Sequence, residues 1–306
     1  MSVDTQLQAV FQKILLLDPD GSHIGWAIRN SIDQLLDGQH TGRYHWNQLY
    51  KTEKTHAGTL VEINIQRSLR LQDGKDLDYS IEDVEVDCKY SQRLYEWMIP
   101  PEAQQGQICL VVWASDELSR WSAGLIRTGE SHLSPSENRD KKKRLNEVGR
   151  KAIAWIFKDH QLPPNVFLQM SEEHVRDILV HRSGQKRVNR LFVHAQGKIV
   201  TRAAVATAAQ QDDFMKRVRE NGGAREKLRP LGIAILGHEH QEIARHLELK
   251  VIPQKGEFVS VRLIKSTART GRPTALIEGE HWAVAQPEEP ITPAPQLPRA
   301  KPNEEF

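Results

Sequence analysis

The chain has 306 residues, of which 39% are apolar and 27% charged, and its formal net charge is +2. This length exceeds what one hydrophobic core usually supports, so we expect two domains, and the two cysteines exclude a disulfide framework or a cysteine-rich zinc site. No apolar run approaches the ~20 residues that span a bilayer, and the polar start MSVDTQLQ is not a signal peptide, so we expect a cytoplasmic protein with no membrane partner.

Apolar residues recur at helical spacing near the start of the chain. Residues 7–15 and 24–35 carry two amphipathic stripes separated by the turn signal DPDG, which predicts two packed helices. After a polar stretch, LVEINIQRSL at 60–69 indicates a third helix, and this helix carries Glu62.

Strand-like segments follow. We predict a strand around VEVDCKY at 84–90 and a buried strand in QICLVVWAS at 107–115. The loop SENRDKKKR contains a basic run from Lys141 to Arg144 that is typical of a solvated surface. A helix is predicted from Glu147 to Phe157.

The prolines of DHQLPPN predict a linker at 159–165, between a first domain at 1–158 and a second at 166–286. The second domain is expected to contain helices to about Asn221 and then the apolar runs GIAILGH, FVSVRLI and HWAVA. The last twenty residues, 287–306, hold six prolines and are predicted to be a disordered tail.

The second domain is locally basic. Residues 182–229 contain 12 Lys and Arg against 4 Asp and Glu, which favours a polyanionic partner. Within TRAAVATAAQQDDFMKRVREN, an alanine-rich helix, a break near Gln211 and a second helix would resemble a helix-turn-helix. That second helix would bury Phe214, Met215 and Val218 and expose Lys216, Arg217 and Arg219. The alternative is a solvated basic helix face.

The strand at 84–90 places charged side chains together. Alternate residues of a strand share a face, so Asp87 and Lys89 lie on one side, within about 7 Å of each other, while Cys88 faces the core. Asp78 precedes the strand, and Glu62 comes from the helix before it. Oxygen ligands of this kind suit Mg²⁺, which also keeps water and takes phosphate oxygens. The alternative is a weak surface ion pair between Asp87 and Lys89.

These residues resemble the active site of the PD-(D/E)xK nuclease superfamily and, within it, of the NaeI family of type IIE restriction endonucleases. The resemblance covers nearly the whole chain. Its matching stretches are LDPDG at 17–21, KTEKTH at 51–56, GTLVEIN at 58–64, VDCK at 86–89, ICLV at 108–111, AQQDDFMKRVR at 209–219, GGAR at 222–225 and WAVA at 282–285. One departure is Leu77, which stands where the superfamily motif has proline before Asp78.

The resemblance implies an α/β endonuclease core, a central mixed sheet flanked by helices, followed by a mainly helical winged-helix domain like that of the catabolite activator protein. It maps the catalytic residues onto Glu62, Asp78, Asp87 and Lys89, with the three carboxylates as Mg²⁺ ligands. It also implies a homodimer that cuts double-stranded DNA at GCCGGC, centrally and to blunt ends. A second copy of the site, bound by the winged-helix domain, would stimulate cutting.

Further DNA contacts are expected from basic side chains in both domains. They are Arg43, Lys51, Lys54, Lys216, Arg217, Arg219, Arg225, Lys227 and Arg229. His56 is a weaker candidate for a general base, and His238 with His240 is interpreted as a surface loop rather than a metal site. The alternative function is a DNA-binding regulator that retains the nuclease fold without cutting. The exact recognition sequence depends on a few groove-facing side chains, which the sequence does not identify.

Overall fold

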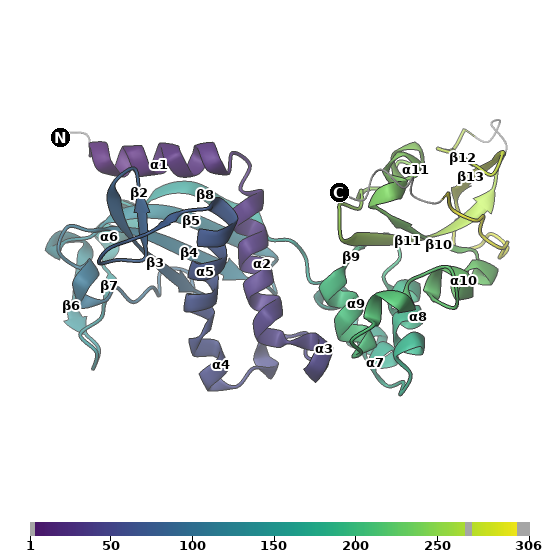
Figure 1. Ribbon diagram of the computed structural model, residues 1–306, viewed down its shortest axis with the longest axis horizontal. Coiled ribbons are helices and arrows are strands. Elements are labelled where there is room, and N and C mark those ends of the chain that lie inside the picture. The colour runs from purple at the N-terminus through teal and green to yellow at the C-terminus, as the bar shows by residue number, and fades with distance from the viewer. Residues whose placement is uncertain (1–3, 267–270, 299–306) are drawn as a thin grey trace. The chain divides into compact units, whose positions relative to one another are not determined.

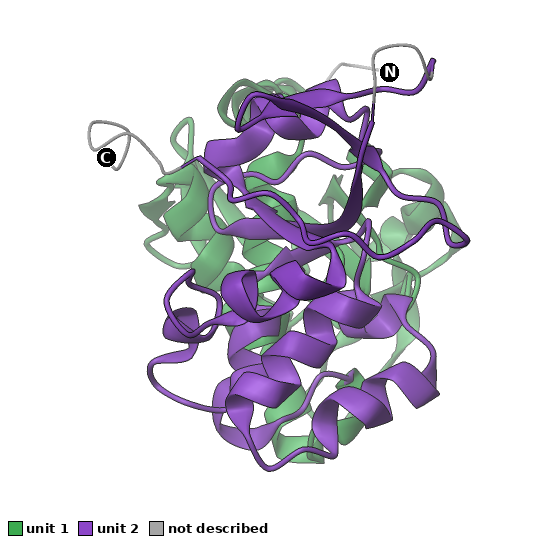
Figure 2. Ribbon diagram, turned by 90° about the vertical axis from the view of Figure 1, so that its right-hand side faces the viewer, with its two compact units in different colours: residues 1–36, 46–164 green, residues 37–45, 165–306 purple. Residues whose placement is uncertain are grey.

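The computed structural model describes residues 4–266 and 271–298, which form two compact units (Figure 1, Figure 2). The first unit comprises residues 1–36 and 46–164, and the second comprises residues 37–45 and 165–306. The second unit therefore includes a short segment from the first half of the sequence. No described helix is both long and apolar enough to cross a membrane.

Helices pack against one face of the sheet in the first unit (Figure 1). The helices of this unit are α1 (Thr5–Leu17), α2 (Ser22–Leu36), α4 (Lys51–Thr55), α5 (Ala57–Leu69) and α6 (Glu147–Lys151). Asp4 accepts the Leu7 N–H and so begins α1. The buried carboxylate of Asp18 accepts two N–H groups in the first turn of α2. The sequence-predicted helices at 7–15, 24–35 and 60–69 are confirmed as α1, α2 and α5.

The sheet of the first unit has six strands. In spatial order they are β1 (Gln72–Asp73), β2 (Tyr79–Ile81), β3 (Val84–Ser91), β4 (Ile108–Ser115), β5 (Arg120–Arg127) and β8 (Ala154–Gln161). β3 and β4 are parallel, whereas the other neighbouring strands are antiparallel. The predicted strands at 84–90 and 107–115 are confirmed as β3 and β4. The unit thus has a mixed α/β architecture consistent with a nuclease core.

Both faces of β4 are buried, and each faces a different apolar cluster. Ile108 and Leu110 pack under the helices. Cys109 and Val111 point the other way, into a cluster that includes Trp97 and the hairpin formed by β6 (Leu133–Glu137) and β7 (Lys143–Leu145). The strand that adjoins the charged residues of β3 is therefore held in place from both sides.

The predicted helix from Glu147 to Phe157 is wrong beyond its first turn. α6 ends at Lys151, and residues from Ala154 onward form the edge strand β8, whose aromatic and β-branched side chains Trp155, Ile156 and Phe157 favour β structure. β8 runs to Gln161, so the predicted linker at 159–165 begins inside a strand. The basic run from Lys141 to Arg144 is not all loop, because its last two residues begin β7.

The second unit contains six helices and five strands among its described residues. The helices are α3 (Gly38–Thr41), α7 (Glu172–Leu179), α8 (Gly184–His194), α9 (Arg202–Ala209), α10 (Ala224–Leu228) and α11 (Gln241–His246). The strands are β9 (Ile199–Thr201), β10 (Ile233–Gly237), β11 (Glu257–Lys265), β12 (Ala275–Ile277) and β13 (Glu280–Val284). They pair in the order β10, β11, β13, β12, and β9 also pairs with β11. More of these residues lie in helices than in strands, but a sheet also forms a large part of this unit.

α3 joins the second unit by packing closely on α9. A Cβ atom at Gly38 would lie 2.0 Å from the Thr207 hydroxyl oxygen and 2.9 Å from the Arg43 carbonyl oxygen. Any residue other than glycine at position 38 would thus push the two helices apart. The close approach places Arg43 in the second unit rather than with the six-stranded sheet.

The predicted second helix of the helix-turn-helix is also wrong. α9 ends at Ala209, the C-cap residue Gln210 adopts a left-handed conformation, and residues 214–217 form one 3₁₀ turn. Val218 is nonetheless buried, and Phe214 and Met215 pack against the same core.

The proline-rich tail is ordered over its first twelve residues. Ala294 and Leu297 are buried in the apolar cluster beside β11 and β12. The Ala294 N–H donates to the Arg229 carbonyl at 2.9 Å, and the Arg229 Nε donates back to the Ala294 carbonyl at 3.3 Å. The predicted disorder is therefore wrong for residues 287–298, whereas residues 299–306 lie outside the described part of the chain.

Candidate active site and basic cleft

Three elements of the first unit bring charged side chains together. Asp78 directly precedes β2, Asp87 and Lys89 lie on β3, and Glu62 lies on α5. β2 pairs with β3 so that Tyr79 is opposite Val86, which sets Asp78 beside the middle of β3. The Tyr79 hydroxyl donates to the Glu62 carbonyl at 2.8 Å and so connects α5 to β2.

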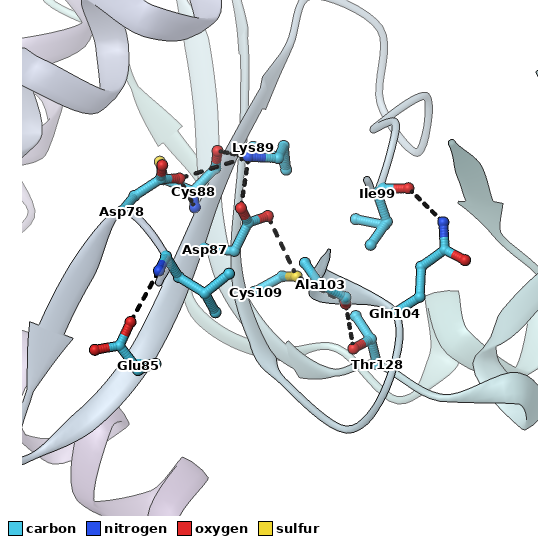
Figure 3. A network of polar contacts seen from close by, with 11 residues as sticks. Asp78, Glu85, Asp87, Cys88, Lys89, Ile99, Ala103, Gln104, Cys109 and Thr128 are labelled. Carbon is cyan, nitrogen blue, oxygen red and sulfur yellow. Dashed lines mark hydrogen bonds and ion pairs between the residues drawn. The ribbon is translucent and has the colours of Figure 1, made fainter. Parts of the chain in front are cut away.

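Lys89 is the centre of the group. Its Nζ donates to Asp87 Oδ1 at 2.7 Å and to the Cys88 carbonyl at 2.9 Å, and it lies 3.5 Å from Asp78 Oδ2 (Figure 3). The Cys88 N–H donates to the same Asp78 oxygen at 2.6 Å. One ammonium thus bridges two carboxylates, one on β3 and one just before β2, and the backbone of β3 fixes the latter.

Glu85 holds the segment that carries Asp78. Its carboxylate accepts three consecutive backbone N–H groups, from residues 75, 76 and 77, at 2.8–3.1 Å. These bonds lower the pKa of Glu85. The alternation of β3 places Glu85 on the face of Asp87, but nothing in the sequence reveals that it organises this loop.

The site has more negative charge than its single lysine balances. Burial raises the pKa of Asp87, although Lys89 opposes this effect. Burial also raises the pKa of Glu62, and the charges of Asp78 and Asp87 raise it further. Burial acts to lower the pKa of Lys89, but Asp87 and Asp78 outweigh it and the net pKa is raised, so the side chain remains an ammonium.

This donor set fits a cation that needs few protein ligands. Within residues 4–266 and 271–298, no three His, Cys, Asp or Glu side chains gather closely enough to enclose a metal. Asp78 and Asp87 nevertheless aim one oxygen each at a common positive group, and excess negative charge surrounds them. Mg²⁺ takes one or two carboxylates and completes its shell with water and phosphate oxygens, so the residues fit Mg²⁺ rather than a metal enclosed by protein ligands.

The predicted DNA-contacting residues divide into exposed side chains and side chains with structural partners. Lys51, Lys227 and Arg219 are exposed, and Lys54 is half-buried on α4. The other predicted residues each contact a group within the protein: Arg43 Nε contacts Thr41, Lys216 contacts Asp213, Arg217 contacts Gln211 and Asp213, Arg225 contacts Glu239 and the Ile235 carbonyl, and Arg229 contacts Ala294. Arg217 is thus partly tied down, contrary to the expectation that it faces outward.

A basic cleft of about 640 Å³ lies in the second unit. Its lining residues are Arg202, Met215, Val218, Arg219, Arg225, His238, Glu239, Lys255, Gly256, Glu257 and Phe258. Arg219 and Arg225 were predicted to contact DNA from the sequence. Arg202, His238 and Lys255 were not, because they come from the start of α9 and from the segment between β10 and β11, far apart in the sequence.

The remaining candidates have structural positions. His56 is exposed at the junction of α4 and α5, and its side chain does not cap α5. His240 is buried, contrary to its interpretation as part of a surface loop: its Nδ1 accepts the Gly237 N–H, and its Nε2 lies 2.9 Å from the Pro298 carbonyl. Cys88 is buried on the core face of β3 as predicted, and burial raises the pKa of its thiol to about 12.

Comparison with known proteins gives two matches that span nearly all of the chain. The family model described as restriction endonuclease NaeI matches residues 8–293. A protein from Lentzea aerocolonigenes named type II restriction enzyme NaeI is 46% identical, and the alignment covers 97% of this chain and 95% of that protein.

Proposed function

The chain belongs to the NaeI family of restriction endonucleases and is a type II site-specific deoxyribonuclease, and we propose that Glu62, Asp78, Asp87 and Lys89 form its active site. The observation that carries this proposal is the bridge from Lys89 Nζ to Asp87 and Asp78. It brings a lysine ammonium together with two carboxylates of the kind that bind metal ions. We further propose that Mg²⁺ is the metal, held by Asp78 and Asp87, with Glu62 completing its shell directly or through water.

Each residue of the site has a role in hydrolysing a phosphodiester. When bound, Mg²⁺ supplies a Lewis acid that neutralises phosphate charge and lowers the pKa of water. Lys89, kept protonated by Asp87 and Asp78, donates hydrogen bonds that orient the attacking water or stabilise charge on the phosphate. Glu62 has a raised pKa and lies within electrostatic reach of Lys89, so it is suited to bind a water near the phosphate. The water oxygen bonds to phosphorus and the P–O3′ bond breaks; the water gives up a proton to solvent, and the 3′ oxygen takes one from solvent and leaves as a hydroxyl.

An Asp87→Asn substitution tests the active site. It keeps the shape of the side chain and removes its charge, so we expect cleavage of plasmid DNA in Mg²⁺ to be lost while DNA binding is retained. Asp83→Asn is the matched control, because Asp83 is an exposed residue of the turn between β2 and β3. Cleavage by Asp87→Asn at the wild-type rate would contradict the assignment. A wild-type protein that shifts DNA without cutting it would instead support a regulator.

We also propose that the second unit binds an effector copy of the DNA site through a winged helix. The order α8, β9, α9, α10, β10, β11 supports this proposal, since β11 lies between β10 and β9 as the last strand of a winged helix would. In this arrangement α10, which carries Arg225 and Lys227, takes the place of the recognition helix that the sequence led us to expect at 212–219. Homodimerisation, the site GCCGGC, the blunt central cut and a cytoplasmic location remain parts of the same proposal.

The basic cleft is where we place the phosphates of the effector DNA. Arg202, Arg219 and Lys255 line it and are exposed, whereas Lys216 and Arg217 pair with Asp213. Replacing the three cleft residues by alanine should weaken effector binding and flatten its salt dependence, because fewer counterions are released. Lys216→Ala with Arg217→Ala should have the smaller effect. The reverse ranking would place the DNA outside the cleft.

A further inference from the structure

The second oxygen of Asp87 has a partner that the active-site motif does not include. Asp87 is 3% exposed, and Lys89 takes its Oδ1. Its Oδ2 lies 3.6 Å from Cys109 Sγ, within the range of a hydrogen bond to sulfur (Figure 3). The two oxygens of this carboxylate therefore face two different donors, one an ammonium and the other a thiol.

The sheet brings these two residues together directly. β3 and β4 are parallel, and Asp87 is the register partner of Cys109. Cys109 is fully buried among apolar side chains that include Trp97, Ile99 and Val111. The surroundings of Asp87 Oδ2 on this side of the sheet are thus mainly apolar, and a buried carboxylate oxygen without a donor is costly.

The thiol lies closer to Asp87 than to its other possible acceptor. The Ala103 carbonyl lies 4.0 Å from Cys109 Sγ, at the limit of such a contact. Thr128 already donates its hydroxyl to this carbonyl at 2.6 Å. Cys109 carries its proton at neutral pH, since an ordinary thiol has a pKa of about 8.5. The shorter contact to Asp87 is therefore the one that the S–H group serves.

We infer that Cys109 is a positioning residue, which holds the Asp87 carboxylate in the orientation that presents it to the catalytic cation. This inference rests on the proposed active site. The terminal torsion of an aspartate is broad, so one anchored oxygen leaves the carboxylate free to rotate. A second anchor removes that freedom. Because a thiol is a weak donor, it fixes Oδ2 while withdrawing little of the negative charge that attracts a cation.

A purely apolar role for Cys109 makes different predictions. Buried cysteines often act as small hydrophobic side chains. In that case Cys109→Ser would be at least as harmful as Cys109→Ala, since it would bury a hydroxyl among apolar groups. If Cys109 positions Asp87, Cys109→Ser retains a donor and should rescue the function that Cys109→Ala loses.

The test measures cation binding separately from cutting. Mn²⁺ binding to the full chain can be followed by the electron paramagnetic resonance signal of free Mn²⁺, and Mg²⁺ dependence by plasmid cleavage. Loss of a group that orients a metal ligand weakens metal binding about 10–100-fold. For a weak donor we expect the lower end, so Cys109→Ala should raise the Kd for Mn²⁺ and the half-saturating Mg²⁺ about tenfold. Cys109→Ser should stay close to wild type.

Val111→Ala is the matched control. Val111 lies two residues further along β4, points into the same cluster, and has no polar contact to offer Asp87. It should lower thermal stability as Cys109→Ala does and leave the Kd for Mn²⁺ unchanged. Wild-type Mn²⁺ binding by Cys109→Ala, or equal losses in Cys109→Ser and Cys109→Ala, would overturn the inference.

Two further measurements keep the outcomes separable. If Asp87→Asn cuts normally, the proposed active site fails; if Asp87→Asn is inactive but Cys109→Ala binds Mn²⁺ normally, only the positioning role fails.

Should Cys109→Ala not fold, the infrared S–H stretch decides whether the Cys109 thiol donates a hydrogen bond. A band shifted by hydrogen bonding should be present in wild type and in Cys88→Ala and absent from Cys109→Ser. A Cys109 thiol band at the position of a free S–H group would refute the contact.

Discussion

Replacing Lys89 by methionine removes the ammonium that bridges Asp87 and Asp78 and keeps much of the apolar stem. Asp87 is then left buried with Oδ1 unpaired, beside a second carboxylate. Removing one partner of a buried ion pair typically costs 3–5 kcal/mol. Because the Lys89 and Asp78 side chains retain 23% and 21% exposure, water screens part of this loss. We expect the first unit to lose about 2–3 kcal/mol.

The loss should be visible in thermal unfolding without metal. For a unit of this size it corresponds to a fall of roughly 4–12 °C in Tm. Lys13→Met is the control, because Lys13 pairs with Glu82 at the surface and should change stability by less than about 0.5 kcal/mol. Lys89→Met should also abolish cleavage while DNA binding persists.

The pH dependence gives a second test of the same reasoning. Without Lys89, burial raises the pKa of Asp87 further above its value in the unfolded chain. A carboxyl with a raised pKa in the folded state stabilises the fold at low pH and loses that contribution as pH rises through the folded pKa. The stability difference between wild type and Lys89→Met should therefore be small in acid and grow with pH. A pH-independent difference, or an unchanged Tm, would refute the bridging role.

Three other outcomes follow from the structure. EDTA should stop cleavage, Mg²⁺ or Mn²⁺ should restore it, and Ca²⁺ should support DNA binding without cutting because its looser geometry places the reactants poorly; efficient cutting in Ca²⁺ alone would argue against the mechanism. Burial lowers the pKa of His240, with Arg225 adding to the effect and Glu239 opposing it, so the second unit should lose stability as pH falls below about 6.5; thermal scans of His240→Asn should lack this slope. Gly38→Ala should destabilise the packing of α3 on α9 by about 1–3 kcal/mol, which limited proteolysis of residues 37–45 would detect; unchanged protection would contradict the close approach at Thr207.

The parts of the fold that sequence patterns predicted are those whose pattern is local. α1, α2 and α5 each bury one stripe at a period that the sequence repeats, and β3 shows the alternation that puts Asp87 and Lys89 on one face. β8 was taken for helix although Trp155, Ile156 and Phe157 favour β structure, because its pairing with β5 is a contact that no local period records. The ordered segment 287–298 was missed for the same reason.

The site could be predicted only in part from the sequence. Asp87 and Lys89 follow from strand geometry, but the approach of Asp78 depends on the β2–β3 pairing and on the loop that Glu85 holds. The cleft was out of reach, because Arg202 and Lys255 are brought together by folding and belong to no single charged run. Glu85 and Cys109 gave no signal of their own, since each acts through a partner that only the structure identifies.

The direct test of the central claim is to locate the metal. Crystals of the Lys89→Met variant, which should bind DNA without cutting it, can be grown with duplex DNA and Mn²⁺ and measured by anomalous diffraction. The proposed active site predicts an anomalous peak contacting the carboxylates of Asp78 and Asp87 and an oxygen of the DNA backbone. Mn²⁺ bound elsewhere, with these two carboxylates contacting neither metal nor DNA, would contradict it.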